Sequence, residues 1–375
     1  MTDLGAGTEL ENNHGSTNSI YHSTTSLSQY QDSPEVSYNR SWLGKVLSKF
    51  NNNHPSSTVT SDYEEYPSRI PYKKFMKDSR ISIFSNNLKL DDKLDKLSHV
   101  SVLRLTKSIF HRGGHGITEL PTSFAKLNKN LCELDLRGNP LGNIPEVLFQ
   151  LQRLTILNLE NCELIEVPEQ MCQLVSLKKL YLDNNKIMLN NTLSLPSIEH
   201  LSLSNNQIVD ITKIQLYNLE VLDVSENFIE ILPDTLMEVS SKLKKLILRG
   251  NSMQRLPNSI AKMKSLKWLD VSKNILKKLP NEIGELNNLR YLNISWNDLT
   301  ALPENITKLI NLKGQVFYCG ENPLQKPPYE VAVEGIEAIK SYFKALNGGS
   351  TSCHSSRLKL MILGNEKTGK LIKEI

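Results

Sequence analysis

The sequence has little cysteine and no long apolar run. Its five cysteines are odd in number and widely scattered, without a CxxC pair, which argues against a disulfide framework and indicates a reducing compartment. No stretch reaches the roughly 18 continuous apolar residues that a membrane span requires. The first residues, MTDLGAGTELENNHGST, contain neither the basic nor the apolar region of an export signal. We therefore expect a cytoplasmic protein without a transmembrane segment.

An excess of charge of one sign is also lacking. The 44 Lys and Arg residues are opposed by 40 Asp and Glu residues, so the formal charge of +4 is too small to indicate a nucleic-acid-binding surface. With 39% hydrophobic and 22% charged residues, the composition is that of an ordinary globular protein, and it excludes a fully disordered or collagen-like chain.

Residues 1–66 are rich in Ser, Asn, Thr, Tyr and His and show almost no apolar periodicity, which predicts a disordered tail. One segment within it, from Arg40 to Phe50 (RSWLGKVLSKF), places its apolar residues on one helical face and its basic residues on the other. This segment is either a docking helix, for a partner groove or an anionic membrane surface, or a transient helix in the tail. Residues 67–99 are predicted to form the boundary and cap before the next region. Their basic side chains either favour acidic partners or lipid headgroups or are simply solvated.

From about residue 100 the sequence repeats the pattern LxxLxLxxNxI/LxxLP. Successive copies are separated by 23, 23, 21, 21, 24, 23, 23 and 23 residues. The copies begin at Leu131, Leu154, Leu177, Ile198, Leu219, Leu243, Leu266, Leu289 and Leu312. In each LxL the two leucines point inward and the middle residue outward, because successive side chains on a strand alternate between faces. One strand per repeat predicts a parallel sheet.

The motif resembles the leucine-rich repeat family, of the 23-residue intracellular type ending in LP. The resemblance implies an α/β solenoid over residues 100–326, about ten repeats curved into a horseshoe with the parallel sheet on its concave face. It also implies that an asparagine in each turn bonds to neighbouring backbone and forms a ladder. These asparagines are Asn139, Asn185, Asn206, Asn227, Asn251, Asn274 and Asn297, with Cys162 in the same position of the second repeat.

The departures from the pattern carry their own predictions. The repeats at Leu177 and Ile198 are short and lack LP, so the convex layer should be thinner there. A glycine-containing insertion at 108–114 is expected to be a loop rather than a phosphate cradle, and the last repeat fits only with two extra residues after Leu312. Residues 327–347 have apolar positions at helical spacing, which predicts one helix sealing the open end of the solenoid, followed by a linker over 348–356.

The concave face is the predicted partner-binding surface, because a solenoid offers a wide, preformed sheet there. The candidate residues are outward-facing positions of the strands and their turns, with aromatics and arginine as expected hot spots. They are Trp268, Asp270, Tyr291, Asn293, Trp296, Arg249, Tyr181 and Asp223. The alternative for the aromatic residues is that they cover each other or lie under the capping region. His200 on this face has no second metal ligand in the pattern, so no metal site is predicted.

The segment 357–375 contains RLKLMIL, a predicted buried strand, followed by GNEKTGK, which matches GxxxxGK. Repeats, a capping helix, a linker and this motif follow one another in the same order as in Roco proteins, including the leucine-rich-repeat kinases. That resemblance implies that Gly364, Gly369 and Lys370 belong to the guanine-nucleotide site of a Roc-type GTPase domain cut short. Leu371 occupies the position of the magnesium-binding hydroxyl. We therefore expect GTP and Mg²⁺ only in a longer product with a complete Roc domain, and no cofactor in this chain.

Two functions remain open from the sequence. The first is a non-catalytic scaffold of intracellular signalling that binds a protein partner, for example a small GTPase or a signalling kinase, on the concave face. The second is the regulatory N-terminal part of a Roco-type GTP-binding protein or kinase whose catalytic domains are missing from this chain. The strand and loop alone cannot hold a preorganised phosphate site, so we expect no catalysis by this polypeptide.

Overall fold

The computed structural model describes residues 76–84, 88–107, 115–239, 241–312 and 316–348. Several features predicted from the sequence lie outside these residues. They are the tail 1–66 with the segment from Arg40 to Phe50, the inserted loop 108–114, nearly all of the linker 348–356, and the phosphate-loop segment 357–375.

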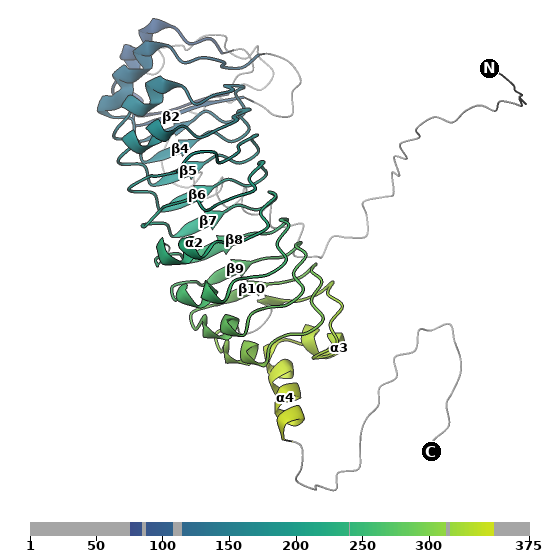
Figure 1. The fold of residues 1–375 in the computed structure, drawn as a ribbon. Coiled ribbons are helices and arrows are strands. Elements are labelled where there is room, and N and C mark those ends of the chain that lie inside the picture. The colour runs from purple at the N-terminus through teal and green to yellow at the C-terminus, as the bar shows by residue number, and fades with distance from the viewer. Residues whose placement is uncertain (1–75, 85–87, 108–114, 240, 313–315, 349–375) are drawn as a thin grey trace, which may run out of the picture. The chain divides into compact units, whose positions relative to one another are not determined.

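Within the described residues, eleven parallel strands form one open, curved sheet in which each strand pairs with the next along the chain (Figure 1). The strands are β1 Arg80–Phe84, β2 Val102–Thr106, β3 Glu133–Asp135, β4 Ile156–Asn158, β5 Lys179–Tyr181, β6 His200–Ser202, β7 Val221–Asp223, β8 Lys245–Ile247, β9 Trp268–Asp270, β10 Tyr291–Asn293 and β11 Phe317–Tyr318. The register aligns the middle leucine of one strand with that of the next, as in the pair Leu246 and Leu269, and both are fully buried. This confirms the predicted leucine-rich repeat solenoid.

Short helices cover the side of the sheet opposite the concave face (Figure 1). Most are 3-10 helices that begin directly after the proline of an LP step, because the proline ring fixes φ and its missing N–H is not needed in a first helical turn. The 3-10 helices are η2 Asp92–Leu97, η3 Thr122–Lys129, η4 Glu146–Gln150, η5 Glu169–Gln173, η6 Asn258–Lys262, η7 Asn281–Glu285 and η8 Glu304–Lys308. The 24-residue repeat that begins at Leu219 has an α-helix in this place, α2, Asp234–Val239.

The two short repeats have a different convex side. Among the described residues no helix lies between β5 and β6 or between β6 and β7. An isolated parallel bridge between Leu193 and Ile214 takes its place, and both side chains are buried. The thinner convex layer predicted for these repeats is therefore confirmed.

A ladder of buried asparagines joins the repeats where the chain leaves each strand. Asn251 shows the pattern: its Nδ2 donates to the carbonyls of Leu248 in its own repeat and Val224 in the preceding one, and its Oδ1 accepts from the N–H of Ile229. The donor–acceptor distances are 2.9, 3.0 and 2.9 Å. The same arrangement recurs at Asn185, Asn206, Asn227, Asn274 and Asn297. The ladder that the family resemblance implied is thus present.

The second and last repeats vary this ladder. Cys162 has no acceptor oxygen, so the N–H of Leu141 bonds instead to the carbonyl of Asn139, while the Cys162 thiol donates to the carbonyl of Leu136. In the last repeat Asn322 joins the ladder, accepting from the N–H of Leu299 and lying 25 residues after Asn297. This spacing matches the predicted insertion of two residues after Leu312.

The N-terminal end contains a strand that the repeat pattern did not predict. β1 pairs in parallel with β2 and buries Ile81 and Ile83, while η2 places Leu94 and Leu97 in the same core. The sequence RISIF lacks the LxxLxLxxN spacing, which is why counting repeats misses it. The region 76–99 therefore covers the first repeat with a strand and helix of its own.

At the C-terminal end, two helices replace the single helix predicted over 327–347. They are α3, Tyr329–Val333, and α4, Ile336–Asn347, separated at Gly335, whose φ of 105° ends the first helix. α4 lies against η8, buries Ile339 and Phe343, and is tied to it by a hydrogen bond from Asn347 Nδ2 to Glu304 Oε1. The apolar helical periodicity was correct, but it did not reveal the break because glycine interrupts a helix without changing the pattern.

Replacing Asn251 with alanine should lower the free energy of unfolding by about 2–3 kcal/mol. The carbonyls of Val224 and Leu248 each keep a second amide donor, from Asn227 and Asn274, but the N–H of Ile229 loses its acceptor inside the core. Urea unfolding followed by circular dichroism measures the change. The exposed Asn287→Ala is the control and should stay within about 0.5 kcal/mol of the unmodified protein. Equal stability of both variants would contradict a stabilising ladder.

Candidate functional site on the concave face

The concave face presents three rows of side chains, with one residue per repeat in each row. The register fixes the first two rows, and the third row follows each strand. The first row contains Glu133, Ile156, Lys179, His200, Val221, Lys245, Trp268 and Tyr291; the second contains Arg104, Asp135, Asn158, Tyr181, Ser202, Asp223, Ile247, Asp270, Asn293 and Tyr318; the third contains Arg137, Glu160, Asp183, Ser204, Ser225, Arg249, Ser272 and Ser295. Neighbouring residues in a row lie one strand spacing apart, about 4.8 Å.

An aromatic cluster of Trp268, Tyr291 and Tyr318 lies at the C-terminal end of this face. The rings of Trp268 and Tyr291 are stacked, with centroids 3.5 Å apart and planes 7° apart, and Tyr318 is tilted against Tyr291 at 5.5 Å. The Lys245 ammonium lies 4.8 Å from the Trp268 ring centroid. All four side chains are half-buried. Trp268 and Tyr291, which were predicted to be neighbours, do cover part of each other, and both rings are partly exposed.

Two other candidates on this face, Asp270 and Asn293, are nearly covered. Their exposed fractions are 8% and 6%. Asp270 Oδ1 accepts from the N–H and hydroxyl of Ser272, and Asn293 Oδ1 accepts from the N–H and hydroxyl of Ser295. Their hydrogen-bonding capacity is largely used within the floor of the face, so they hold its shape beneath the aromatic cluster.

Trp296 lies apart from the aromatic cluster. It follows Tyr291 by five residues and begins the turn after β10, one residue beyond the third row. Its side chain is 48% exposed, and its φ is 57°. The equivalent turn positions of other repeats have the same left-handed backbone, whatever the residue type: Asn184, Asn205, Glu226, Gly250, Lys273 and Glu321.

Arg249 is the cationic residue among the candidates, and it lies directly before the turn of its repeat. It forms an ion pair with Glu226 of the preceding repeat at 3.6 Å. Both side chains are partly exposed, so the pair itself adds little stability. Arg249 belongs to the third row, on the side of the face away from Trp268.

Carboxylates supported by serines form the centre of the face. Asp183 Oδ1 accepts from the Ser202 hydroxyl at 2.6 Å and from the Ser204 N–H at 2.7 Å. Asp223 is held in the same way by the N–H and hydroxyl of Ser225. Burial raises the pKa of Asp183 to about 7, with a smaller contribution from the negative charge of Asp223. Burial also raises the pKa of Asp223.

Tyr181 and His200 lie beside these carboxylates. Their ring centroids are 5.1 Å apart, and burial raises the pKa of Tyr181 to about 12. Burial, helped by the charges of Lys179 and Lys245, lowers the pKa of His200 to about 4, so the imidazole is neutral at physiological pH. Among the described residues no group of three or more His, Cys, Asp or Glu side chains is arranged to hold a metal ion.

The N-terminal part of the face contains ion pairs that the sequence candidates did not include. Arg104 bonds to Glu133 at 2.5 Å, and Arg137 to Asp135 at 2.9 Å. Burial raises the pKa of Glu160 in the next repeat, against the opposing charge of Arg137. Arg104 was missed because its repeat is interrupted by the insertion at 108–114, although the LRL pattern on β2 gives its position. The face is therefore ionic at one end, acidic in the middle and aromatic at the other end.

The thiols near this face do not offer a reactive centre. Burial raises the pKa of Cys162 and of Cys319 to about 12, so both stay protonated near neutral pH. The nucleotide-binding candidates Gly364, Gly369 and Lys370 lie outside the described residues.

Comparison with known protein families agrees with the repeat structure that the strand pairing shows. The family model described as "Leucine rich repeat" matches residues 129–187 and 241–299, and the model described as "Leucine Rich repeats (2 copies)" matches residues 196–235. The eleven-stranded parallel sheet has the fold of a leucine-rich repeat solenoid, and these matches support it. This fold is typical of protein–protein interaction and is typically non-catalytic.

Two curated relatives resemble part of the domain. The volume-regulated anion channel subunit LRRC8D of Rattus norvegicus is 34% identical over 96 residues, covering 25% of this chain and 10% of that protein. The volume-regulated anion channel subunit LRRC8A of Homo sapiens is 35% identical over 112 residues, covering 29% of this chain and 13% of that protein. The match thus spans about an eighth or less of the relatives' length. No helix among the described residues of this chain is long and apolar enough to cross a membrane.

Solved structures support the fold. The structure of PEPR1–AtPEP1 is 26% identical with a TM-score of 0.53, covering 68% of this chain and 37% of that one. A TDR receptor structure is 24% identical with a TM-score of 0.56, covering 76% and 50%. The repeat ectodomain of the plant membrane receptor kinase GASSHO1/SCHENGEN3 from Arabidopsis thaliana, in complex with CASPARIAN STRIP INTEGRITY FACTOR 2, is 22% identical with a TM-score of 0.50, covering 68% and 34%.

Replacing Asp183 with asparagine should remove part of the pH dependence of stability. The carboxyl pKa is about 7 in the folded protein against an ordinary value of 3.8. The stability that Asp183 contributes is therefore fully present below about pH 4 and is lost as the pH rises through 7. Asparagine keeps an oxygen for Ser202 and Ser204 but carries no charge. From pH 4 to pH 8 the free energy of unfolding of the variant should gain up to about 4 kcal/mol relative to the unmodified protein, at about 1.4 kcal/mol per pKa unit.

Chemical denaturation across this pH range measures the difference, and Asp210→Asn is the control of opposite sign. The hydrogen bonds from Thr212 lower the pKa of Asp210. Its contribution is present at neutral pH and lost as the pH falls through the lowered pKa, so its variant should be the less stable one near pH 7. If Asp183→Asn has the pH profile of the unmodified protein, the Asp183 carboxylate is not desolvated.

Proposed function

We propose that this chain is a non-catalytic scaffold of intracellular signalling that binds a protein partner on its concave face. The observation that carries the proposal is the aromatic cluster of Trp268, Tyr291 and Tyr318 with Lys245 over the Trp268 ring. Rigid aromatic side chains bury much area at low entropic cost, and they dominate binding hot spots in protein interfaces. Stacking fixes these rings before a partner arrives, which reduces the cost of binding further.

The exposed side chain of Trp296 supports a binding role for the same repeat. Aromatic side chains are enriched in protein interfaces. At 48% exposure the side chain gains little from packing within this chain. Trp296 and the aromatic cluster flank the covered Asp270 and Asn293, so a partner that spans the face would contact aromatics on both sides.

The likeness to PEPR1–AtPEP1, a structure that names two molecules together, also supports a binding function. We propose a signalling protein, such as a small GTPase or a kinase, as the partner, and the cytoplasm as the location. Supporting the location, Cys132, Cys162, Cys172 and Cys319 are free thiols. Stable free thiols fit a reducing compartment.

A second proposal is that the repeats form the regulatory arm of a Roco-type GTP-binding protein. It is supported by the sequence alone, in which RLKLMILGNEKTGK follows the repeats and the helical cap. Gly364, Gly369 and Lys370 would then contact guanine-nucleotide phosphates, and a hydroxyl residue would be needed for Mg²⁺ where this chain has Leu371.

Trp268→Ala should abolish capture of the concave-face partner. Removing a central aromatic hot spot weakens binding by about 2 kcal/mol or more, roughly 30-fold in affinity. Quantitative mass spectrometry of proteins co-purified with the tagged full chain measures this, with thermal unfolding to show that the variant is folded. The control is Tyr217→Ala, an exposed aromatic residue outside the concave rows. A partner set that is unchanged by Trp268→Ala and Tyr291→Ala contradicts the proposal.

Sequencing the full-length transcript across the codon for Ile375 tests the Roco proposal. Continuation through a Ser or Thr after Gly-Lys and into DxxG and NKxD motifs is the expected result, because a GTPase needs these groups for magnesium, catalysis and base recognition. A stop codon directly after Ile375 contradicts it.

A further inference from the structure

A stripe of exposed apolar side chains runs along one flank of the solenoid, outside the concave face. We call it the flank stripe and define it as Ile165, Met188, Val209, Phe228 and Ile231. The exposed fractions of these side chains range from 42% at Met188 to 65% at Ile231. They come from four consecutive repeats and lie just after the ladder position of each. Contiguous apolar surface of this kind indicates an interaction site.

Backbone hydrogen bonds hold the flank segments side by side. The N–H of Met188 donates to the carbonyl of Ile165 at 3.0 Å, and the N–H of Phe228 donates to the carbonyl of Ile208 at 2.9 Å. Between them, the N–H of Gln207 donates to the carbonyl of Ile187. Ile165, Met188 and Val209 each lie three residues after the ladder position, so over these three repeats the stripe advances by one apolar residue per repeat, in steps close to the strand spacing of about 4.8 Å. In the fourth repeat Glu230 takes the equivalent position, and Phe228 and Ile231 lie on either side of it. Its backbone is fixed by the ladder, so the surface is preformed.

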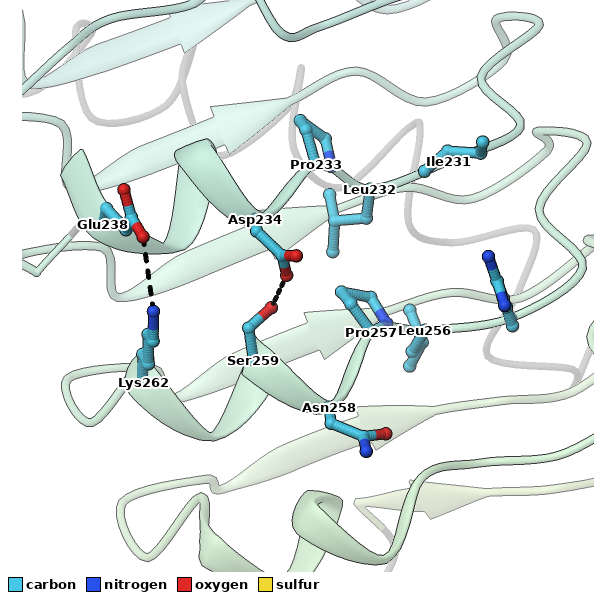
Figure 2. Close-up of a pocket in the computed structure, with 11 residues that line it drawn as sticks. Ile231, Leu232, Pro233, Asp234, Glu238, Leu256, Pro257, Asn258, Ser259 and Lys262 are labelled. Carbon is cyan, nitrogen blue, oxygen red and sulfur yellow. Dashed lines mark hydrogen bonds and ion pairs between the residues drawn. The ribbon is translucent and has the colours of Figure 1, made fainter.

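At its C-terminal end the flank stripe leads into a hollow of about 580 Å³ between α2 and η6. Ile231 belongs to both features. The hollow lies between two successive LP steps, and Figure 2 shows the Pro233 and Pro257 rings on either side of it. On the helix side it is closed by a hydrogen bond from Ser259 to Asp234 and an ion pair between Lys262 and Glu238 at 3.4 Å (Figure 2). Its wall also includes Leu232 and Leu256, which suit an apolar side chain.

Acidic side chains border the flank stripe. Glu163, Glu166, Asp210 and Glu230 are exposed on three of the four flank segments. Two lysines lie among them: Lys186 pairs with Glu163 at 3.5 Å, and the charge of Lys213 helps to lower the pKa of Asp210. The border therefore has a net negative charge. The hollow itself is lined by two acidic and two basic side chains, Asp234, Glu238, Arg255 and Lys262. A second copy of this chain that met the stripe with its own acidic border would be repelled, whereas a partner with Lys or Arg beside its apolar residues would be attracted.

From these features we propose that the flank stripe and the adjoining hollow bind a basic amphipathic α-helix of a partner protein. A helix rises about 5.4 Å per turn, close to the spacing of the repeats, so one apolar residue per turn meets one apolar residue per repeat. Lysines or arginines beside that apolar row meet the carboxylates of the border. A bulky apolar residue at one end of the helix fills the hollow. This surface is separate from the concave face, so the inference goes beyond the proposed function and does not depend on it.

The probe for the test is a synthetic amphipathic helix of about 18 residues, five turns, with Leu on one face and Lys on its borders. A second peptide has Glu in place of every Lys. Fluorescence anisotropy with the full chain should show binding of the Lys peptide and at least roughly tenfold weaker binding of the Glu peptide. Equal affinities, or no detectable binding of the Lys peptide, overturn the proposal.

The variant Met188→Asp with Val209→Asp should weaken binding of the Lys peptide at least roughly tenfold, although it adds negative charge, because it removes the apolar contact. Tyr217→Asp is the matched control, an equally exposed apolar position off the stripe, and it should bind as the unmodified chain does. Ile231→Asp tests the mouth of the hollow and should also weaken binding. The substituted side chains are exposed, and melting curves establish that each variant is folded.

Trp268→Ala separates this site from the concave face and should leave the peptide affinity unchanged. If Trp268→Ala removes peptide binding while Met188→Asp with Val209→Asp does not, the peptide binds the concave face and the flank proposal is wrong. Loss of the concave-face partner in the Trp268→Ala variant with peptide binding retained shows two independent surfaces.

Discussion

In most repeats of this solenoid the chain leaves the sheet through an asparagine amide that bonds to backbone of two repeats at once, and Cys162 replaces that amide in the second repeat. Asn251 bonds to Leu248 in its own repeat and to Val224 and Ile229 in the one before. The turn needs these bonds because its N–H and carbonyl groups face a core with no water to replace them. The amide therefore sets both the depth of the turn and the distance between repeats. The concave rows and the flank stripe inherit their spacing from it.

Burial of polar groups also shapes the concave face. Strands about 4.8 Å apart bring carboxylates such as Asp183 and Asp223 into a partly dry floor, where hydroxyls from Ser202 and Ser225 hold them. Their pKa values rise because these serines do not offset the loss of water. At the aromatic end the covered Asp270 supports the floor while Trp268 and Tyr291 remain accessible. The two ends of the same sheet therefore differ chemically.

The repeat spacing predicted most of this frame, because 23-residue periodicity specifies strand, turn and register together. It also located Trp268 and Tyr291 next to each other. It failed where the determining contact is not periodic. β1 follows no repeat, and Gly335 breaks the C-terminal helix without altering its apolar pattern. The burial of Asn293 depends on the side chains of its neighbours, and the distance of Trp296 from the cluster depends on the left-handed turn. Neither is visible in a motif that records only residue types.

The stretch from β5 to β7 differs mechanically from the stretches beside it. Elsewhere helices pack against helices along the back, as η6, η7 and η8 do, and resist compression there. Over the two short repeats no helix is described on the back, and the segments there are joined by the bridge between Leu193 and Ile214 and by hydrogen bonds such as that from Asn218 Nδ2 to the carbonyl of Pro196. An elastic rod bends where its cross-section is thinnest, so we expect the curvature of the solenoid to be softest at this point. The acidic centre of the concave face lies over that point, with ion pairs on one side and aromatics on the other. A partner that binds both ends at once would therefore change the curvature of the solenoid mainly between β5 and β7, and part of its binding free energy would be spent on that bending.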